Sequence, residues 1–255
     1  MRFIVESSFL GTSYVGWQKQ PDQVSVQSVL EGELSTCLRI PVEITGCGRT
    51  DSGVHARQYY FHFDHGEMPP DDLIYRLNKM LPADIALHAI WRVSDDGHAR
   101  FSAVQRSYRY HLNFKKDPFN THTSLHYPYA DNLDFDKMLE AGEMLLEYQE
   151  FRPFCKTGSD TPHYLCTLSE ARWDRSGNKA TFTITSNRFL RGMVRLVVGM
   201  MLQVGRDAIL LDDLRKAMES QRPLKRADSA PAHGLYLTSV QYPQNFLGIP
   251  VPGSV

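Results

Sequence analysis

The stretch at residues 42–64 reads VEITGCGRTDSGVHARQYYFHFD and contains two strand-like segments around a polar turn. Residues 42–46 favour a strand, and residues 58–64 alternate so that Tyr59, Phe61 and Phe63 share one face. Three glycines within the eight residues 46–53 permit backbone conformations that other side chains forbid. The stretch therefore predicts two strands joined by a tight turn that can hold one polar group out into a cleft.

Outside this stretch, the chain alternates between strand and helix patterns. Strands are expected at residues 2–7, 86–93, 108–114 and 234–242, with a hairpin at 165–173 and 179–186. Helices are expected at residues 25–38, 70–80, 134–148, 189–204 and 211–220. The order strand, helix, strands, helix, strand occurs about twice, and the turns between strands are short. Both features favour an α+β fold with mostly antiparallel strands. We expect two similar halves, residues 1–104 and 105–255.

The predicted helix at residues 134–148 has two distinct faces. Its apolar positions are expected to face inward: Phe135, Met138, Leu139, Gly142, Leu145 and Leu146. Its acidic residues would then face solvent, and we interpret them as a solvated helix face rather than a metal site.

Composition excludes several classes of protein. The 255 residues are 42% hydrophobic, which excludes a disordered chain, and the net charge of −1 argues against binding any polyanion through bulk charge. The cations are nevertheless clustered, because residues 97–116 and 175–206 contain Lys and Arg but no Asp or Glu. That clustering allows a positive surface for phosphates. No signal peptide, membrane span or C-x-x-C pair is evident, so we expect a cytoplasmic protein with reduced thiols.

The polar turn offers Asp51 as its most reactive group. Arg49 lies two residues away, and a nearby cation favours the ionised carboxylate, which can act as a nucleophile, a base or a metal ligand. A structural carboxylate is the alternative. The turn lacks the third glycine of a dinucleotide loop, and the chain has no P-loop motif. Residues 51–53 match the D-S-G signature of aspartic proteases, which need two such carboxylates, and no second copy is present.

One further polar pair lies on the strand after the turn. His62 and Asp64 fall on one face of the alternating segment, and we interpret them as surface residues rather than metal ligands.

The motifs of the whole chain, taken in order, resemble those of the tRNA pseudouridine synthase A family. The turn itself reads GRTDSGVHA at residues 48–56. The other matching segments are YVGWQKQ at 14–20, VQSVLE at 26–31, LNKMLPADI at 77–85, HARFSA at 98–103, RSYRY at 106–110, FLRGMVRLVVG at 189–199 and APAHGLYL at 230–237. Cys47, Ser52, Gly97 and Leu196 depart from the residues usual in that family.

The resemblance implies a pseudouridine synthase fold, with two α/β halves forming an RNA-binding cleft, and a set of residue roles. Asp51 would be the nucleophile that detaches uracil from ribose, by attack on the sugar or on carbon 6 of the base. Arg195 would keep Asp51 ionised, Tyr108 would stack on the target base, and Arg49 would help to expel that base from the stem. Leu235 would pack at the floor of the pocket. The RNA contacts implied are His98, Arg100, Phe101 and residues 156–160.

The same resemblance implies a substrate and an assembly. The expected substrate is uridine at positions 38 to 40 of tRNA, in the anticodon stem-loop, and the expected assembly is a homodimer. It implies no metal and no organic cofactor. Two alternatives stay open at this point: a non-catalytic RNA-binding module of similar fold, and, more distantly, an aspartic protease that uses one Asp51 from each of two subunits.

Overall fold

A computed structural model describes residues 1–159, 161–224 and 228–253 and divides the chain into two compact units. The first unit contains Met1–Gln105 together with the chain from Tyr236 onward, and the second contains Arg106–Leu235. We had expected halves at 1–104 and 105–255. The structure differs in its last segment, which lies with the first unit because its strands pair there.

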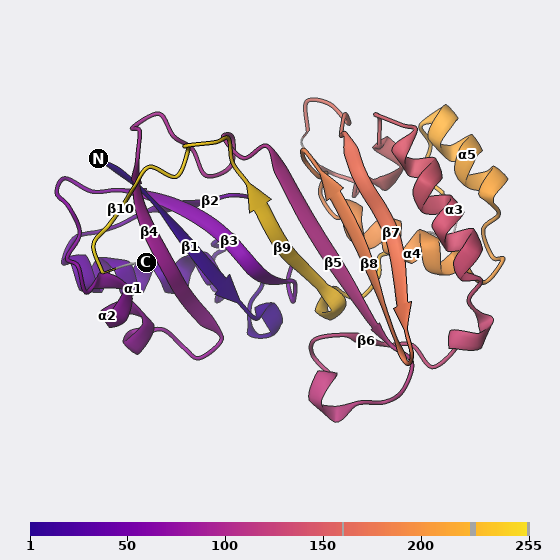
Figure 1. The fold of residues 1–255 in the computed structure, drawn as a ribbon, viewed down its shortest axis with the longest axis horizontal. Helices are drawn as coiled ribbons and strands as arrows, with labels where there is room; N and C mark the ends of the chain where they lie inside the picture. The colour runs from indigo at the N-terminus through magenta and orange to yellow at the C-terminus, as the bar shows by residue number, and fades with distance from the viewer. Residues whose placement is uncertain (160, 225–227, 254–255) are drawn as a thin grey trace. The chain divides into compact units, whose positions relative to one another are not determined.

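The first unit is a five-stranded sheet with one additional short strand and two helices (Figure 1). Its elements are β1 (Arg2–Phe9), α1 (Val26–Leu38), β2 (Ile44–Gly46), β3 (His55–Asp64), α2 (Leu73–Met80), β4 (Ile85–Val93), β9 (Leu235–Gln241) and β10 (Ile249–Pro250). The strand order is β10-β4-β1-β3-β9, and β2 pairs with β3. All pairs are antiparallel except β3 with β9, which confirms the mostly antiparallel sheet.

An aromatic core lies on one face of β3, as the alternation of the sequence predicted. Tyr59, Phe61 and Phe63 are all buried. Trp17 stacks on Tyr59 with ring centroids 4.1 Å apart, and Phe3 stacks on Phe63 at 5.5 Å. Helices α1 and α2 contact each other, α1 also contacts β2, and α2 also contacts β4. Burial of these large apolar rings stabilises this unit.

The second unit contains a smaller sheet and three helices (Figure 1). Its elements are β5 (Gln105–Asn113), β6 (Leu125–His126), α3 (Phe135–Leu146), β7 (Leu168–Ser176), β8 (Lys179–Ser186), α4 (Met193–Val204) and α5 (Leu211–Ser220). Strands β5-β8-β7 are antiparallel, and β6 pairs with β5 in parallel. The predicted hairpin is confirmed, because β7 and β8 are joined at Gly177, whose φ is +56°.

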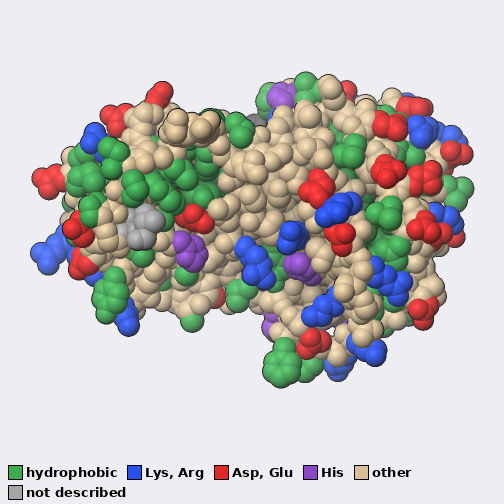
Figure 2. Space-filling view, viewed as in Figure 1, with side chains coloured by type: hydrophobic (Ala, Val, Ile, Leu, Met, Phe, Trp, Pro, Cys, Tyr) green, Lys and Arg blue, Asp and Glu red, His purple; other side chains and the backbone are tan. Residues whose placement is uncertain are grey.

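Helix α3 is present as expected, but its buried stripe is rotated from the predicted one. Met138, Gly142 and Leu145 are buried, whereas Leu139 and Leu146 are exposed, so their inward assignment was wrong. Ala141 is buried instead, because α3 packs against β7, α4 and α5 and its contacts follow the i, i+3, i+4, i+7 positions. Figure 2 shows acidic side chains over the part of this unit where α3 and α5 lie. Within the described residues, no helix combines the length and apolarity needed to cross a bilayer.

Candidate active site

The loop at residues 46–54, called here the Asp51 loop, joins β2 to β3 and is held through its backbone. Gly16 and Asp51 pair through a single antiparallel bridge. The N–H of Trp17 donates to the carbonyl of Thr50 at 3.2 Å, and the N–H of Val54 donates to the carbonyl of Asp51 at 3.1 Å. Asp51 is half-buried. Main-chain hydrogen bonds on both sides therefore fix the backbone from which its carboxylate projects.

Glycine is required at position 16, where the preceding segment crosses this loop. Gly16 has a φ of +105°, and a Cβ there would lie 2.3 Å from the carbonyl oxygen of Thr50. Two residues earlier, the Tyr14 carbonyl accepts from the N–H of Gly53 at 3.3 Å and from the Ser52 hydroxyl at 3.2 Å. Only a residue without a side chain permits this close approach of two backbones.

Buried residues of β3 support the Asp51 loop. The Tyr59 hydroxyl donates to the carbonyl of Gly48 at 2.5 Å, and the N–H of Cys47 donates to the carbonyl of Tyr60 at 2.7 Å. His55, fully buried, accepts the N–H of Gly11 at its Nδ1 at 2.9 Å and packs on Tyr236, with ring centroids 4.6 Å apart. The β9 strand thus supports the first residue of β3, directly after the loop.

The carboxylate of Asp84 holds Tyr14, which lies in the segment at residues 14–17 that contains Gly16. Burial and the Asp84 carboxylate both raise the pKa of Tyr14, so its hydroxyl stays protonated and donates to Asp84 at 2.5 Å. Tyr14 also supplies the carbonyl that holds Ser52 and Gly53. Arg49, by contrast, is exposed at the rim of the Asp51 loop.

The loop at residues 97–102, called here the Phe101 loop, brings His98, Arg100 and Phe101 together. Phe101 is 76% exposed. The Arg100 guanidinium lies 5.5 Å above its ring, and the His98 ring lies 4.3 Å from it. The N–H groups of Arg100 and Phe101 both donate to His98 Nδ1, at 3.0 and 3.3 Å. An exposed aromatic ring beside a cation is suited to stacking on a nucleobase.

His62 is part of the support for the Phe101 loop, and its assignment as a surface residue was wrong. His62 is only 6% exposed, and its Nδ1 accepts the N–H of Ala99 at 3.1 Å. The Tyr242 hydroxyl donates to the carbonyl of Ala99 at 2.7 Å. Burial, followed by the nearby Arg2 guanidinium, lowers the pKa of His62 to about 4. The alternating pattern does not predict this burial, because β3 is an interior strand that is covered on both faces.

The second unit holds the other predicted site residues. Arg195 lies half-buried in the first turn of α4, where its Nε donates to the carbonyl of Ala230 at 2.7 Å. The N–H of Ala230 donates back to the carbonyl of Arg195 at 3.0 Å. Leu235 is buried at the start of β9. These contacts explain how an arginine is accommodated in an apolar helix.

Tyr108 and Tyr110 on β5 differ in their surroundings. Tyr110 is fully buried and donates its hydroxyl to the carbonyl of Pro231 at 2.8 Å, so it is the core tyrosine of this strand. Tyr108 is half-buried and meets Phe189 edge to face, with centroids 5.1 Å apart. Its partial exposure is compatible with stacking on a base.

A basic groove on the second unit includes part of the predicted contact segment 156–160. Its cationic lining residues are Arg152, Lys156 and Arg222, and Tyr164 lies beneath Arg152 at 5.7 Å. Asp160 lies outside the described residues. Arg152 and Arg222 were missed from the sequence, although the charged stretch QRPLKR at 221–226 was a signal for the second. Among the described residues, no group of three or more His, Cys, Asp or Glu could hold a metal ion.

Comparison with known proteins finds one family. A family model described as "tRNA pseudouridine synthase" matches residues 6–102 and 148–243. A Bacteroides fragilis protein named tRNA pseudouridine synthase A is 41% identical over 246 residues, covering 95% of this chain and 97% of that protein. The proteins of that name from Porphyromonas gingivalis and Chlorobaculum tepidum are 41% and 39% identical over 249 and 234 residues. They cover 96% and 91% of this chain, and the alignments span 98% and 94% of those proteins.

Proposed function

Because the chain belongs to the tRNA pseudouridine synthase family, we propose that Asp51 is the nucleophile with which it isomerises uridine in the anticodon stem-loop of tRNA. The reaction class follows from the family: the chain is an isomerase that converts uridine to pseudouridine in tRNA. The observation that supports Asp51 is its loop, in which hydrogen bonds from two neighbouring segments fix the backbone around a half-buried carboxylate.

The isomerisation balances without a change of oxidation state. The bond between ribose C1′ and uracil N1 breaks, and a bond between C1′ and uracil C5 forms. C5 loses its proton to solvent and N1 gains one, so substrate and product have the same composition. Attack on C1′ and attack on C6 both require an ionised carboxylate, which makes the protonation state of Asp51 the central electrostatic requirement. Arg195 of the second unit is the residue assigned by resemblance to keep it ionised.

The target uridine must leave its stacked position before a carboxylate can reach it. Arg49 is exposed beside Asp51 and is assigned to that extrusion. The Phe101 loop offers an exposed ring and a guanidinium for the flanking RNA, and Tyr108 supplies a face for the extruded base. The basic groove at Arg152, Lys156 and Arg222 adds cations for phosphates. By resemblance we also expect a homodimer, which light scattering on the purified protein measures directly.

Release of tritium from tRNA labelled at uracil C5 tests the proposal, because that hydrogen leaves only when the new carbon–carbon bond replaces it. We expect release by the intact protein and none by Asp51→Ala. Asp64→Asn is the matched control, since Asp64 lies at the opposite end of β3 in an exposed ion pair with Arg2. Sequencing of the product would place the modified uridines.

Two results would overturn this assignment. Full activity of Asp51→Ala would exclude Asp51 as the nucleophile. Undetectable product in the intact protein, together with tight tRNA binding, would favour the non-catalytic RNA-binding module instead.

A further inference from the structure

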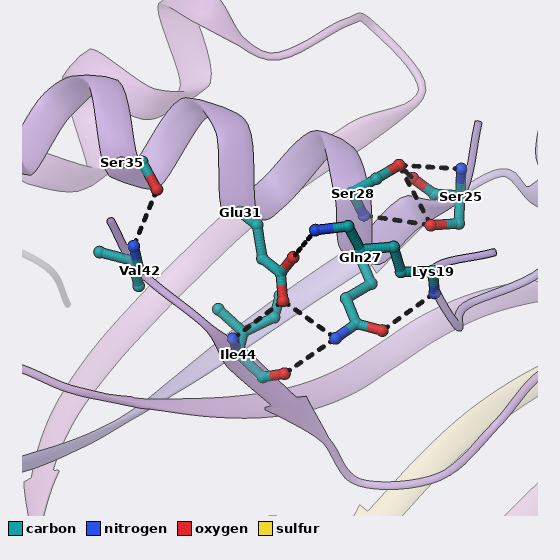
Figure 3. Close-up of polar contacts among 8 residues, drawn as sticks. All are labelled: Lys19, Ser25, Gln27, Ser28, Glu31, Ser35, Val42 and Ile44. Atoms are coloured by element: carbon teal, nitrogen blue, oxygen red, sulfur yellow. Dashed lines mark hydrogen bonds and ion pairs between the residues drawn. The ribbon is translucent and has the colours of Figure 1, made fainter. Parts of the chain in front are cut away.

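Glu31 of α1 is a buried carboxylate of the first unit, and its two oxygens accept hydrogen bonds from Gln27, Ile44 and Lys19 (Figure 3). It is 9% exposed. Its Oε1 accepts from Gln27 Nε2 at 3.0 Å and from the N–H of Ile44 at 3.2 Å. Its Oε2 accepts from Lys19 Nζ at 3.3 Å. A buried carboxylate carries a desolvation cost that an apolar residue in the same place would not.

Gln27, one helical turn earlier, uses its amide in the same way. Its Nε2 also donates to the carbonyl of Ile44 at 3.1 Å, and its Oε1 accepts the N–H of Lys19 at 3.0 Å. Gln27 and Glu31 together therefore satisfy both the N–H and the carbonyl of Ile44, as a neighbouring strand would. Figure 3 shows these two side chains reaching from α1 to β2 and to the segment that contains Lys19.

Both segments held in this way flank Asp51. Strand β2 ends at Gly46, where the Asp51 loop begins. The segment before Lys19 contains Gly16 and Trp17, which bridge to Asp51 and bond to Thr50. The backbone of α1 reinforces that link, because the N–H of Gln27 donates to the carbonyl of Trp17 at 3.0 Å.

From this geometry we infer that Gln27 and Glu31 are positioning residues for catalysis, which set the place of the Asp51 loop by clamping its two flanking segments to α1. The inference rests on the proposed function, in which Asp51 is the nucleophile. In this assignment the two side chains act on the backbone that carries the loop and not on the substrate. They act through Ile44 and Lys19, and a misplacement of about 1 Å at a reacting group costs about 100-fold in rate.

The test compares Glu31→Gln and Gln27→Met with Ser35→Ala. Ser35 lies on the same helix and its hydroxyl accepts the N–H of Val42 at 2.9 Å, so its loss removes a similar link that is farther from the loop (Figure 3). We expect the single-turnover rate at saturating tRNA to fall by about 10- to 100-fold in Glu31→Gln and Gln27→Met, with unchanged tRNA affinity. Ser35→Ala should stay within about 2-fold of the unmodified protein. Gln27 is only half-buried, so its variant should fold even if Glu31→Gln does not.

Amide hydrogen exchange over residues 47–54 provides a readout that is independent of the chemistry. The two clamp variants should exchange faster there, whereas Ser35→Ala should not. Unchanged exchange in Gln27→Met, or an equal rate loss in Ser35→Ala, would overturn the inference. Failure of the proposed function looks different: the unmodified protein would release no tritium, or Asp51→Ala would still release it, while the exchange experiment would still decide whether the clamp orders the loop.

Discussion

The Asp51 loop and the Phe101 loop are both attached to β3, but they are built in opposite ways. Tyr59 supports the first through the Gly48 carbonyl, and His62 supports the second through the Ala99 N–H. The Asp51 loop is rich in small residues and is fixed by backbone contacts. The Phe101 loop is tied at its base and projects a large ring, 76% exposed, into solvent. The difference is that between a group that must be placed accurately and a group that must be accessible.

The largest effect is expected from Gly16→Ala, which alters the contact that fixes the Asp51 loop. A Cβ at a φ of +105°, 2.3 Å from the Thr50 carbonyl, would push the Asp51 loop out of place. We expect a loss of stability of about 1–3 kcal/mol and a fall in the single-turnover rate of about 100-fold or more. Thermal unfolding and tritium release would measure the two effects.

Gly48→Ala, within the Asp51 loop, is the control, because apart from its two chain neighbours no atom lies within 4 Å of a Cβ built there. It should leave both measurements unchanged. Equal losses in the two variants would mean that any side chain in this region is harmful, and that the crossing at Gly16 has no special importance.

Phe101→Ala should affect binding rather than chemistry. Loss of an exposed stacking ring costs about 1–3 kcal/mol, so the Kd for tRNA should rise by roughly 5- to 150-fold while the rate at saturation and the melting temperature stay close to those of the unmodified protein. Phe119, which is 93% exposed on the second unit, supplies the control. If Phe119→Ala weakened binding as much, exposure alone would explain the result.

The smallest expected effect concerns pH and the support of the Phe101 loop. The pKa of His62 is lowered to about 4 in the folded protein, whereas an unfolded histidine has a pKa of about 6.5, so the unfolded chain binds more protons between these values. The free energy of unfolding should therefore fall as the pH drops from about 6.5 to about 4. The decrease should be on the order of 1 kcal/mol after allowance for solvent screening.

Urea unfolding across that pH range should show that the free energy of unfolding of His62→Gln depends less on pH than that of the unmodified protein. His126→Gln, at an exposed position on β6, should keep the original slope. A parallel decline in all three proteins would assign the pH dependence to other groups, among them His98, whose pKa burial also lowers.

Local patterns in the sequence were enough to predict most helices and strands. The helix at 211–220 matches α5, and α1 begins at Val26 because Ser25 caps it through the Ser28 N–H at 3.1 Å. The burial of His62 was not predictable, since the groups that contact it, the His98 ring and the Ala99 N–H, lie more than 30 residues away in the chain. The rotated stripe of α3 has the same origin, because its neighbours decide which of several apolar positions is buried.

The candidate site, too, was only partly predictable from the sequence. Asp51 was singled out by the three glycines of its turn. The family resemblance supplied roles for Arg195 and Tyr108, and these roles stay predictions. What holds Asp51 in place was not visible in the sequence, because Gly16 pairs with Asp51, and Trp17 bonds to Thr50, through main-chain groups that every residue type carries. The segment 26–31 was matched to the family motif, but only the structure shows that Gln27 and Glu31 both bond to Ile44 and to Lys19.

The return of the chain to the first unit has a consequence for the order of events during synthesis. β9 pairs with β3 at His55, and β10 pairs with β4, so the first unit draws on residues 236–250, which leave the ribosome after the whole second unit. The second unit is continuous from Arg106 to Leu235 and can close first. Domains generally fold as units during translation, from the N-terminus onward. Here the unit that carries Asp51 begins before the second unit and is completed after it, so the Asp51 loop gains its β9 support only once the second unit has been synthesised.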